Sequence, residues 1–486
     1  MRLSELLREV EFEGSIKNDF DIKFVTDDSR LVRPGALFVC IRHRSFDGHT
    51  AAAEALASGA AAVVTQERLG LENELNVADS RAAYARLCAA LCGHPERKLR
   101  MIGVTGTNGK TTVTTLIRNI LSDSGIKTLL TGTVCNRLGE ESLPSGLTTP
   151  KPPELYSLLS RAVLSGCEAC VAEVSSQALA QGRLEGIAFD AAVFTNITRD
   201  HLDYHGTFEN YLAAKKKLFE HSEVSAVNLD DPRADEIIAA SSGKTVTFST
   251  VLDCADYTAK NISLLPEGVS FELVSKGRIE HINFASPGLF SVSNAMAAVV
   301  CAINLGVDPR SVAQSLARSK GVCGRLERVE CGTPYSVIID YAHTPDGLEQ
   351  VLRALRPSCR GKLIVLFGCG GDRDKTKRPL MGAAACKYAD TVIVTSDNPR
   401  SEEPMKIIGD ILKGTDKKRC GLFIEEDRRR ATALALSLAK PGDTVLLAGK
   451  GHEKYQLICG EKLPLDERET VREILGLPHD TGRKKP

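Results

Sequence analysis

The chain has 486 residues, of which 43% are hydrophobic and 26% charged, as expected for a globular protein with several domains. Lysine plus arginine equals aspartate plus glutamate at 62 each, which argues against a basic nucleic-acid-binding protein and against an acidic tail. The N-terminal segment lacks the apolar stretch of a signal peptide. The sequence also contains no window of ~18 apolar residues that would predict a membrane span. We therefore expect a cytoplasmic protein that binds neither nucleic acid nor membrane.

Apolar strand-like runs alternate with helical segments along the whole chain, which predicts an α/β fold. Many runs are continuously apolar, as in parallel sheets that are covered by helices on both faces. The predicted strands lie at 35–41, 60–65, 101–106, 168–176, 190–198, 225–230, 335–343, 362–371, 390–399 and 443–451. Shorter alternating segments at 243–284 predict antiparallel hairpins inserted in the middle of the chain.

The segment "MIGVTGTNGKTTVTTLIRNIL", residues 101–121, predicts a strand, a glycine turn and a helix. Backbone N–H groups of such a turn surround phosphate oxygens at the helix N-terminus. Lys110 would reach the β- and γ-phosphates, and Thr111 would offer a hydroxyl to Mg²⁺. Val104 replaces the first glycine of the usual motif, and a simple structural turn is the alternative. Because no guanine-reading segment is found, ATP is favoured.

Polar side chains follow two other predicted strands. Glu173 ends "VAEVSS" and is a candidate Mg²⁺ ligand or a turn cap. His201 and His205 are spaced as H-x-x-x-H without the glutamate of a zinc protease, and backbone-bonded turn histidines are the alternative. The cysteine pair Cys167 and Cys170 has no second pair at zinc spacing, so buried thiols are expected there.

One arginine stands in a polar turn after an apolar strand, in "DNPR" at 397–400. Arg400 at a strand end is suited to read a carboxylate of a ligand. The alternative is a structural salt bridge to Glu402 or Glu403.

Eight segments occur in one order and closely resemble the Mur ligases of peptidoglycan synthesis. They are "GVTGTNGKTT", "AEVSSQAL", "FTNITRDHLDYHGTFENYLAAKKKLF", "GRLE", "DYAHTPDGL", "FGCGGDRDKTKRPLMG", "DNPR" and "GKGHEKYQ". The resemblance runs from about residue 26 to 456 and implies three domains. These are a small α/β UDP-sugar-binding domain (1–98), a central P-loop ATPase-like parallel-sheet domain (99–325) and a Rossmann-like, amino-acid-binding C-terminal domain (326–486).

The resemblance implies an ADP-forming peptide synthase that uses ATP and Mg²⁺. The D-glutamate carboxylate of UDP-N-acetylmuramoyl-L-alanyl-D-glutamate would attack the γ-phosphate, and the amine of meso-2,6-diaminopimelate would then displace phosphate from the acyl phosphate. It also implies these small-molecule partners, and we expect a monomer. The catalytic residues would be Lys110, Glu173, His201 and a carbamylated Lys215; the Mg²⁺ ligands would be Thr111, Glu173, His201 and Lys215. An ordinary solvated lysine is the alternative for Lys215.

The resemblance further implies three sets of binding residues. The expected ATP contacts are Gly106, Thr107, Asn108, Gly109, Lys110, Thr111, Thr112, Asn294, Arg325, Asp340 and His343. The expected UDP-muramoyl-dipeptide contacts are Ser29, His43, Arg44, Thr148, Thr149, Ser175, Gln181 and Arg183. The expected diaminopimelate contacts are Arg373, Asp397, Asn398, Pro399, Arg400, Gly449 and Glu453, with Glu453 on the distal ammonium.

Three alternatives stay open. The ligase could take L-lysine or another diamino acid in place of diaminopimelate. A folylpolyglutamate synthetase-like ligase shares the P-loop core, although the "DDSR" and "DNPR" segments speak against it. A nucleotide-dependent switch would bind ATP without ligase chemistry.

Overall fold

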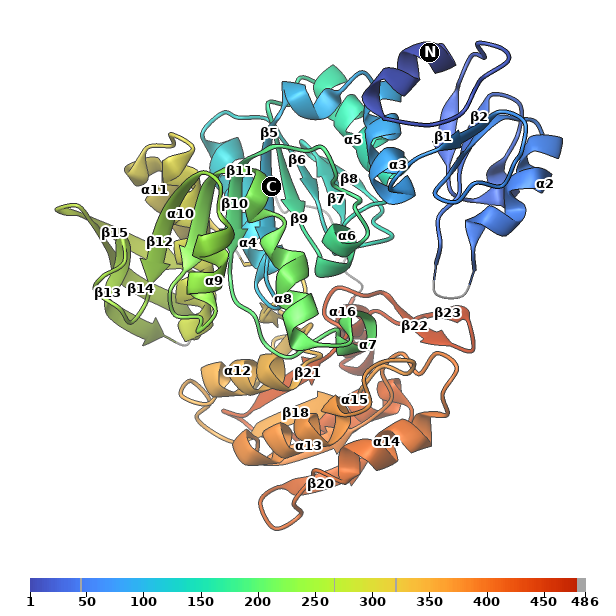
Figure 1. The fold of residues 1–486 in the computed structure, drawn as a ribbon. Helices are drawn as coiled ribbons and strands as arrows, with labels where there is room; N and C mark the ends of the chain where they lie inside the picture. Colours follow the sequence, from blue (N-terminus) through green and yellow to red (C-terminus); the bar gives the residue numbers. More distant parts are fainter. Residues whose placement is uncertain (44–45, 266, 320, 479–486) are drawn as a thin grey trace.

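The computed structural model describes residues 1–43, 46–265, 267–319 and 321–478. They form three larger β-sheets that follow one another along the chain and a small two-stranded sheet (Figure 1). The blue N-terminal sheet and the orange-red C-terminal sheet lie on different sides of the large central sheet. None of the helices in the described part of the chain has the length and apolar character needed to cross a bilayer. The predicted α/β class is confirmed, whereas the expected domain limits stay predictions.

The first sheet has four parallel strands in chain order. They are β1 (Phe24–Thr26), β2 (Ala36–Val39), β3 (Ala60–Thr65) and β4 (Glu74–Asn76). The accompanying helices are α1 (Leu3–Leu6), α2 (Ala52–Ala57) and α3 (Ser80–Leu91). Strands β2 and β3 are buried throughout, as their continuous apolar runs predict.

The central sheet has eleven strands in the order β15-β14-β13-β12-β11-β10-β5-β9-β6-β7-β8. They are β5 (Arg100–Thr105), β6 (Thr128–Thr131), β7 (Asn136–Leu138), β8 (Glu141–Leu143), β9 (Ala169–Glu173), β10 (Phe189–Phe194), β11 (Ser222–Asn228), β12 (Lys244–Ser249), β13 (Tyr257–Leu265), β14 (Gly268–Ser275) and β15 (Arg278–Phe284). The prediction of antiparallel hairpins over 243–284 is wrong for β12, which pairs in parallel with both β11 and β13. Only β13, β14 and β15 form antiparallel pairs there, so the segment extends the sheet edge.

Helices cover the central sheet on both faces. They are α4 (Lys110–Asp123), α5 (Pro152–Leu164), α6 (Ser176–Ala180), α7 (Leu202–His205), α8 (Phe208–Lys216), α9 (Ala234–Ala240), α10 (Leu289–Asn304) and α11 (Pro309–Arg318). Helices α4 and α10 pack together over one face, and α5 shares a core with α3 of the N-terminal region on the other. One continuous core therefore joins the first two sheets.

The third sheet has the order β16-β17-β21-β18-β19-β20, and every pair except β16–β17 is parallel. Its strands are β16 (Glu327–Arg328), β17 (Ser336–Asp340), β18 (Leu363–Phe367), β19 (Thr391–Val394), β20 (Gly421–Ile424) and β21 (Thr444–Ala448). Its helices are α12 (Pro345–Leu355), α13 (Lys377–Tyr388), α14 (Pro404–Leu412), α15 (Arg428–Leu438) and α16 (Glu467–Ile474). A separate hairpin of β22 (Tyr455–Ile458) and β23 (Glu461–Pro464) follows β21.

Candidate active site

A cavity of about 660 Å³ lies between the phosphate-loop region of the central sheet and the segments around β17 of the third sheet. Its size is within the usual range for a small-ligand site. All the residues predicted to contact ATP line it, as do Glu173, His201 and Lys215. Residues more than 200 positions apart in the chain therefore meet in one cleft.

The phosphate loop joins β5 to α4 as the sequence predicts. Gly109 caps the helix with a φ of 88°, and a Cβ at this position would overlap Asn294 Oδ1. Only glycine fits both conditions. The N-terminus of α4 consequently faces the cleft, where its free N–H groups suit an anion.

The ammonium of Lys110 folds back onto its own loop. Its Nζ donates to the carbonyl oxygens of Gly106 and Thr107, each at 2.9 Å. Burial lowers the pKa of Lys110, while Glu173 and Asp200 act in the opposite direction. The Lys110 side chain thus lies against carbonyl oxygens of the phosphate loop at the cleft.

Thr111 connects the two walls of the cleft. Its hydroxyl donates to Glu173 Oε2 at 3.1 Å and accepts from Arg325 Nη2 at 3.0 Å. Glu173 is buried and also accepts from the backbone N–H and hydroxyl of Thr133, both at 2.9 Å. The Arg325 guanidinium in turn lies 4.6 Å from the centre of the Tyr341 ring.

Lys215 is only 1% exposed, so the solvated-lysine alternative is wrong. Its Nζ donates to Gly106 O at 2.8 Å and approaches Thr105 Oγ1 at 3.4 Å. Burial, and then repulsion from Lys110, lower the pKa of Lys215 well below its usual value. Burial thus disfavours the charged ammonium form of Lys215.

His201 and His205 have different surroundings. His201 is the N-cap residue of α7 with a φ of 54°, and its Nε2 lies 3.5 Å from Asp200 Oδ2. Burial lowers the pKa of His201. His205 is buried with its Nε2 3.0 Å from Ser176 Oγ, so it serves packing and not the cleft. Asp200 lines the cleft between Lys110 and His201, and sequence reasoning missed it although it directly precedes His201.

The C-terminal wall is held to the phosphate loop by side-chain contacts. Asn108 Nδ2 donates to Asp346 Oδ2 at 3.2 Å. Asp340 is buried and accepts the backbone N–H groups of Leu326 and Ala342, each at 2.7 Å, while burial raises its pKa. Burial also lowers the pKa of His343 to about 4.

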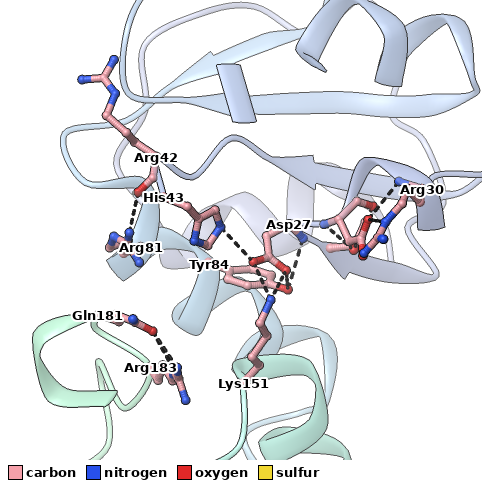
Figure 2. Close-up of polar contacts among 11 residues, drawn as sticks. Asp27, Arg30, Arg42, His43, Arg81, Tyr84, Lys151, Gln181 and Arg183 are labelled. Atoms are coloured by element: carbon pink, nitrogen blue, oxygen red, sulfur yellow. Dashed lines mark hydrogen bonds and ion pairs between the residues drawn. The ribbon is translucent and has the colours of Figure 1, made fainter. Parts of the chain in front are cut away.

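A second, smaller pocket lies where the N-terminal sheet meets the central region (Figure 2). His43 and Lys151 converge on the buried carboxylate of Asp27, with Lys151 Nζ at 3.0 Å and His43 Nε2 at 3.6 Å from Oδ2. At the lower left of Figure 2, Arg183 donates through Nε and Nη2 to Gln181 Oε1, at 2.9 and 2.7 Å. Lys151 and Arg183 are two cations beside the single carboxylate of Asp27, and this excess of positive charge suits an anionic ligand.

The residues predicted to contact the UDP-muramoyl dipeptide are divided between the two pockets. Thr148 and Ser175 line the large cleft, whereas His43, Gln181 and Arg183 line the small one. The set also includes Thr149, Ser29 and Arg44. Thr149 is buried, and its carbonyl oxygen accepts a hydrogen bond from Arg183 Nη1 at 2.7 Å. Ser29 lines neither pocket, and Arg44 lies outside the described residues.

Arg400 has no carboxylate within 4.0 Å in the described ranges, so the predicted alternative of a salt bridge is wrong. Glu402 instead pairs with Arg378 at 2.8 Å. Arg400 has a φ of 54°, and its Nη1 donates to Gly371 O at 2.6 Å. A Cβ at Gly370 would lie 2.8 Å from Arg400 Nη1 and 3.7 Å from Arg373 Cγ, so both arginines flank this glycine.

The other residues predicted for the amino-acid pocket follow the ends of β19 and β21. Asn398 Nδ2 donates to Glu453 Oε2 at 2.9 Å. Lys450, which the sequence reasoning passed over in "GKGHE", donates to Asn398 Oδ1 at 2.9 Å and to Glu453 Oε2 at 2.5 Å. Glu453 therefore already has a cationic partner from the chain itself. None of the seven residues predicted for this pocket lines the large cavity.

Within the described residues no three His, Cys, Asp or Glu side chains converge as a metal site. All fifteen cysteines are free, and both Cys167 and Cys170 are buried, as expected. A site for Mg²⁺ can still be built from fewer protein oxygens together with ligand phosphates.

The fold and cleft define the class: a P-loop α/β protein whose phosphate loop faces a second parallel-sheet region. Three family descriptions match the chain: "Mur ligase family, catalytic domain" at 21–89, "Mur ligase middle domain" at 104–302 and "Mur ligase, glutamate ligase domain" at 324–451. The chain belongs to the Mur ligase family.

Relatives match nearly the full length. The UDP-N-acetylmuramoyl-L-alanyl-D-glutamate--2,6-diaminopimelate ligase of Caldanaerobacter subterraneus subsp. tengcongensis is 44% identical, over 98% of this chain and 99% of its own. The protein of the same name from Syntrophomonas wolfei subsp. wolfei is 43% identical, over 98% and 99%. A solved structure titled with that name is 34% identical with a TM-score of 0.71, covering 98% of this chain and 99% of its own.

Proposed function

We propose that the chain joins meso-2,6-diaminopimelate to the D-glutamate of UDP-N-acetylmuramoyl-L-alanyl-D-glutamate, with ATP converted to ADP and phosphate. The observation that carries the proposal is the match to ligases of that name over nearly the full length of both chains. The cleft supports it because the phosphate loop, two lysines and an arginine meet at one cavity. The monomeric state and the cytoplasmic location stay predictions.

In the first step a carboxylate oxygen of the D-glutamate forms a bond to the γ-phosphorus, and the bond from that phosphorus to the β,γ-bridging oxygen breaks. Two anions must approach each other, so cations carry most of the catalysis. Lys110 and Arg325 are the cations at this point of the cleft, one from each wall. The backbone N–H groups at the start of α4 hold the phosphates.

The donor set at Thr111 and Glu173 fits Mg²⁺, because a hydroxyl and a carboxylate oxygen lie 3.1 Å apart beside the phosphate loop. His201 and Lys215 are proposed for a second ion. Mg²⁺ bound there would neutralise charge on the transferring phosphoryl group.

Lys215 fits carbamylation. Its buried amine has no carboxylate partner within 4.0 Å in the described part of the chain and lies close enough to Lys110 for their charges to repel. The uncharged amine adds to CO₂ and releases one proton, which leaves a carbamate anion. That anion would face Lys110 as a favourable partner and would add an oxygen ligand where the chain has few.

In the second step the diaminopimelate amine attacks the acyl carbonyl carbon, the bond to the phosphate oxygen breaks, and the amine loses a proton. Arg400, with Arg373 beside it, is proposed to bind the distal carboxylate that lysine lacks. Asp397 and Glu453 are proposed to face the distal ammonium.

The test is a phosphate-release assay with ATP, Mg²⁺ and the UDP-muramoyl dipeptide, run in parallel with diaminopimelate, L-lysine and L-ornithine. We expect phosphate and tripeptide product with diaminopimelate at a kcat/KM at least ~100-fold above lysine. Turnover with lysine equal to that with diaminopimelate would reject the assigned amino acid. No product with any of the three would favour a nucleotide-dependent switch.

A further inference from the structure

We propose that Lys450 is a positioning residue that sets the affinity of the amino-acid pocket by holding Glu453 and Asn398 in place. The inference rests on the proposed function, which names the ligand of this pocket. It assigns a role to a side chain that none of the pocket predictions included.

Lys450 is the only lysine of the described residues with 0% side-chain exposure in an ion pair, and its ammonium lies at the centre of the strand-end cluster. Nζ contacts Glu453 Oε2 at 2.5 Å, Asn398 Oδ1 at 2.9 Å and Asp397 Oδ1 at 3.7 Å. Because Asn398 also donates to the same oxygen of Glu453, the three side chains form a closed triangle. Such a triangle fixes the rotamers of both substrate-facing groups.

The charge of Lys450 requires an explanation, because a buried ammonium is costly and an apolar side chain of similar length packs at lower cost. Two carboxylates face it. Asp397 is 6% exposed, and its Oδ1 has no hydrogen-bond partner. Without the ammonium, Asp397 and Glu453 would be like charges sharing one buried site. The Lys450 ammonium therefore lies against the carboxylates of Asp397 and Glu453 and compensates their negative charge.

Lys450 is also linked to the predicted carboxylate reader. Asn398 Oδ1 accepts from the Leu457 N–H at 2.9 Å as well as from Lys450. Backbone hydrogen bonds also join Arg400 to the β22–β23 hairpin. The Arg400 N–H donates to Leu457 O at 3.0 Å, and the Cys459 N–H donates to Arg400 O at 2.7 Å. Loss of Lys450 would thus loosen both ends of the pocket, but it would leave the phosphate loop of the central sheet intact.

A buried ion pair holds the backbone at the base of this cluster. Arg428 and Glu467 form an ion pair in which each side chain is 1% exposed. Arg428 also donates to Ser396 O at 3.3 Å and to Ala448 O at 2.7 Å, at the ends of the two strands that lead into the pocket. With the backbone fixed in this way, the orientation of Glu453 depends on its side-chain partners.

The experiment compares wild type with Lys450→Met, which keeps the stem and removes the charge. We expect the KM and the calorimetric Kd for diaminopimelate to rise by about 10- to 100-fold, since the two hydrogen bonds that order Glu453 and Asn398 are lost. kcat at saturating diaminopimelate and the KM for ATP should stay within ~3-fold, because positioning affects binding and not phosphoryl transfer. Lys450→Gln serves if the methionine variant does not fold.

Lys454→Met is the matched control, because Lys454 is 76% exposed in the same loop. If Lys450 acts through Glu453, the double variant Glu453→Gln/Lys450→Met should bind diaminopimelate no more weakly than the weaker-binding of the two single variants, Glu453→Gln and Lys450→Met. A folded Lys450 variant with KM and Kd within twofold of wild type overturns the inference, as does a loss confined to kcat. Wild type that binds diaminopimelate without forming product refutes the proposed function, while the Kd comparison still decides the role of Lys450.

Discussion

Replacing Arg400 by methionine tests how the pocket separates diaminopimelate from lysine. Methionine keeps the apolar stem and removes the guanidinium. Arg400 uses Nη1 on Gly371 O and has no carboxylate partner within 4.0 Å among the described residues. Its Nε and Nη2 groups therefore remain for a ligand, in the geometry that matches a carboxylate.

Two hydrogen bonds to a charged group contribute about 3–6 kcal/mol in total. The side chain is half-buried, so water recovers part of this on removal. A net loss of ~3 kcal/mol corresponds to a fall of roughly 150-fold in kcat/KM for diaminopimelate. Lysine lacks the distal carboxylate, so its kcat/KM should change by less than ~3-fold in the same variant.

The assay measures kcat/KM for both amino acids in wild type and Arg400→Met, with Arg419→Met as a control from an exposed loop where it pairs with Asp416. The ratio of the two substrates is the decisive quantity, because a general folding defect would lower both. An unchanged ratio would refute the role assigned to Arg400.

Four further outcomes follow from the structure. Lys215→Ala should abolish turnover, and a short-chain carboxylic acid should partly restore it; full activity without the acid would exclude a catalytic carbamate. Burial lowers the pKa of His343 from 6.5 to about 4, so as the pH falls the unfolded chain binds a proton at this histidine before the folded chain does. The stability that the neutral His343 contributes above pH 6.5 should therefore be lost as the pH falls towards 4. In His343→Gln the slope of Tm against pH in this range should be flatter than in wild type. Lys151→Met should lower Tm by less than about 4 °C, because Lys151 is half-exposed in its ion pair with Asp27. Arg400→Gly should raise Tm while lowering diaminopimelate use, because glycine adopts the φ of 54° without strain; an unchanged or lower Tm would argue against backbone strain at this turn.

Strands and the phosphate loop could be predicted because their signals are local. Continuous apolar runs indicate buried parallel strands, and "GTNGKTT" between a strand and a helix indicates an anion site within about twenty residues. The burial of Lys215 could not be read from "AAKKKL", since all three lysines look alike in sequence. Only the packing of α8 against the phosphate loop buries the first of them and leaves Lys217 exposed.

The family resemblance placed Arg325 and the phosphate loop at one ATP site, but the individual contacts between distant segments could not be predicted. Arg325 reaches Thr111 across 214 positions, and Asn108 reaches Asp346 across 238. The parallel pairing of β12 also depends on long-range register, because short alternating strands fit parallel and antiparallel partners equally well. Lys450 was missed because a lysine between two glycines looks like a solvated loop residue until its burial is known.

A chain of contacts links the two halves of the reaction. Arg325 bonds to Thr111 in the phosphate loop and stacks on Tyr341, whose ring centre lies 5.1 Å from that of His452. His452 directly precedes Glu453 in the proposed amino-acid pocket. Side chains in contact with one another thus connect the phosphate loop to the proposed amino-acid pocket. We therefore expect the relative position of the central and C-terminal sheets to affect both steps, and substitutions in Tyr341 to change the KM values for ATP and diaminopimelate together.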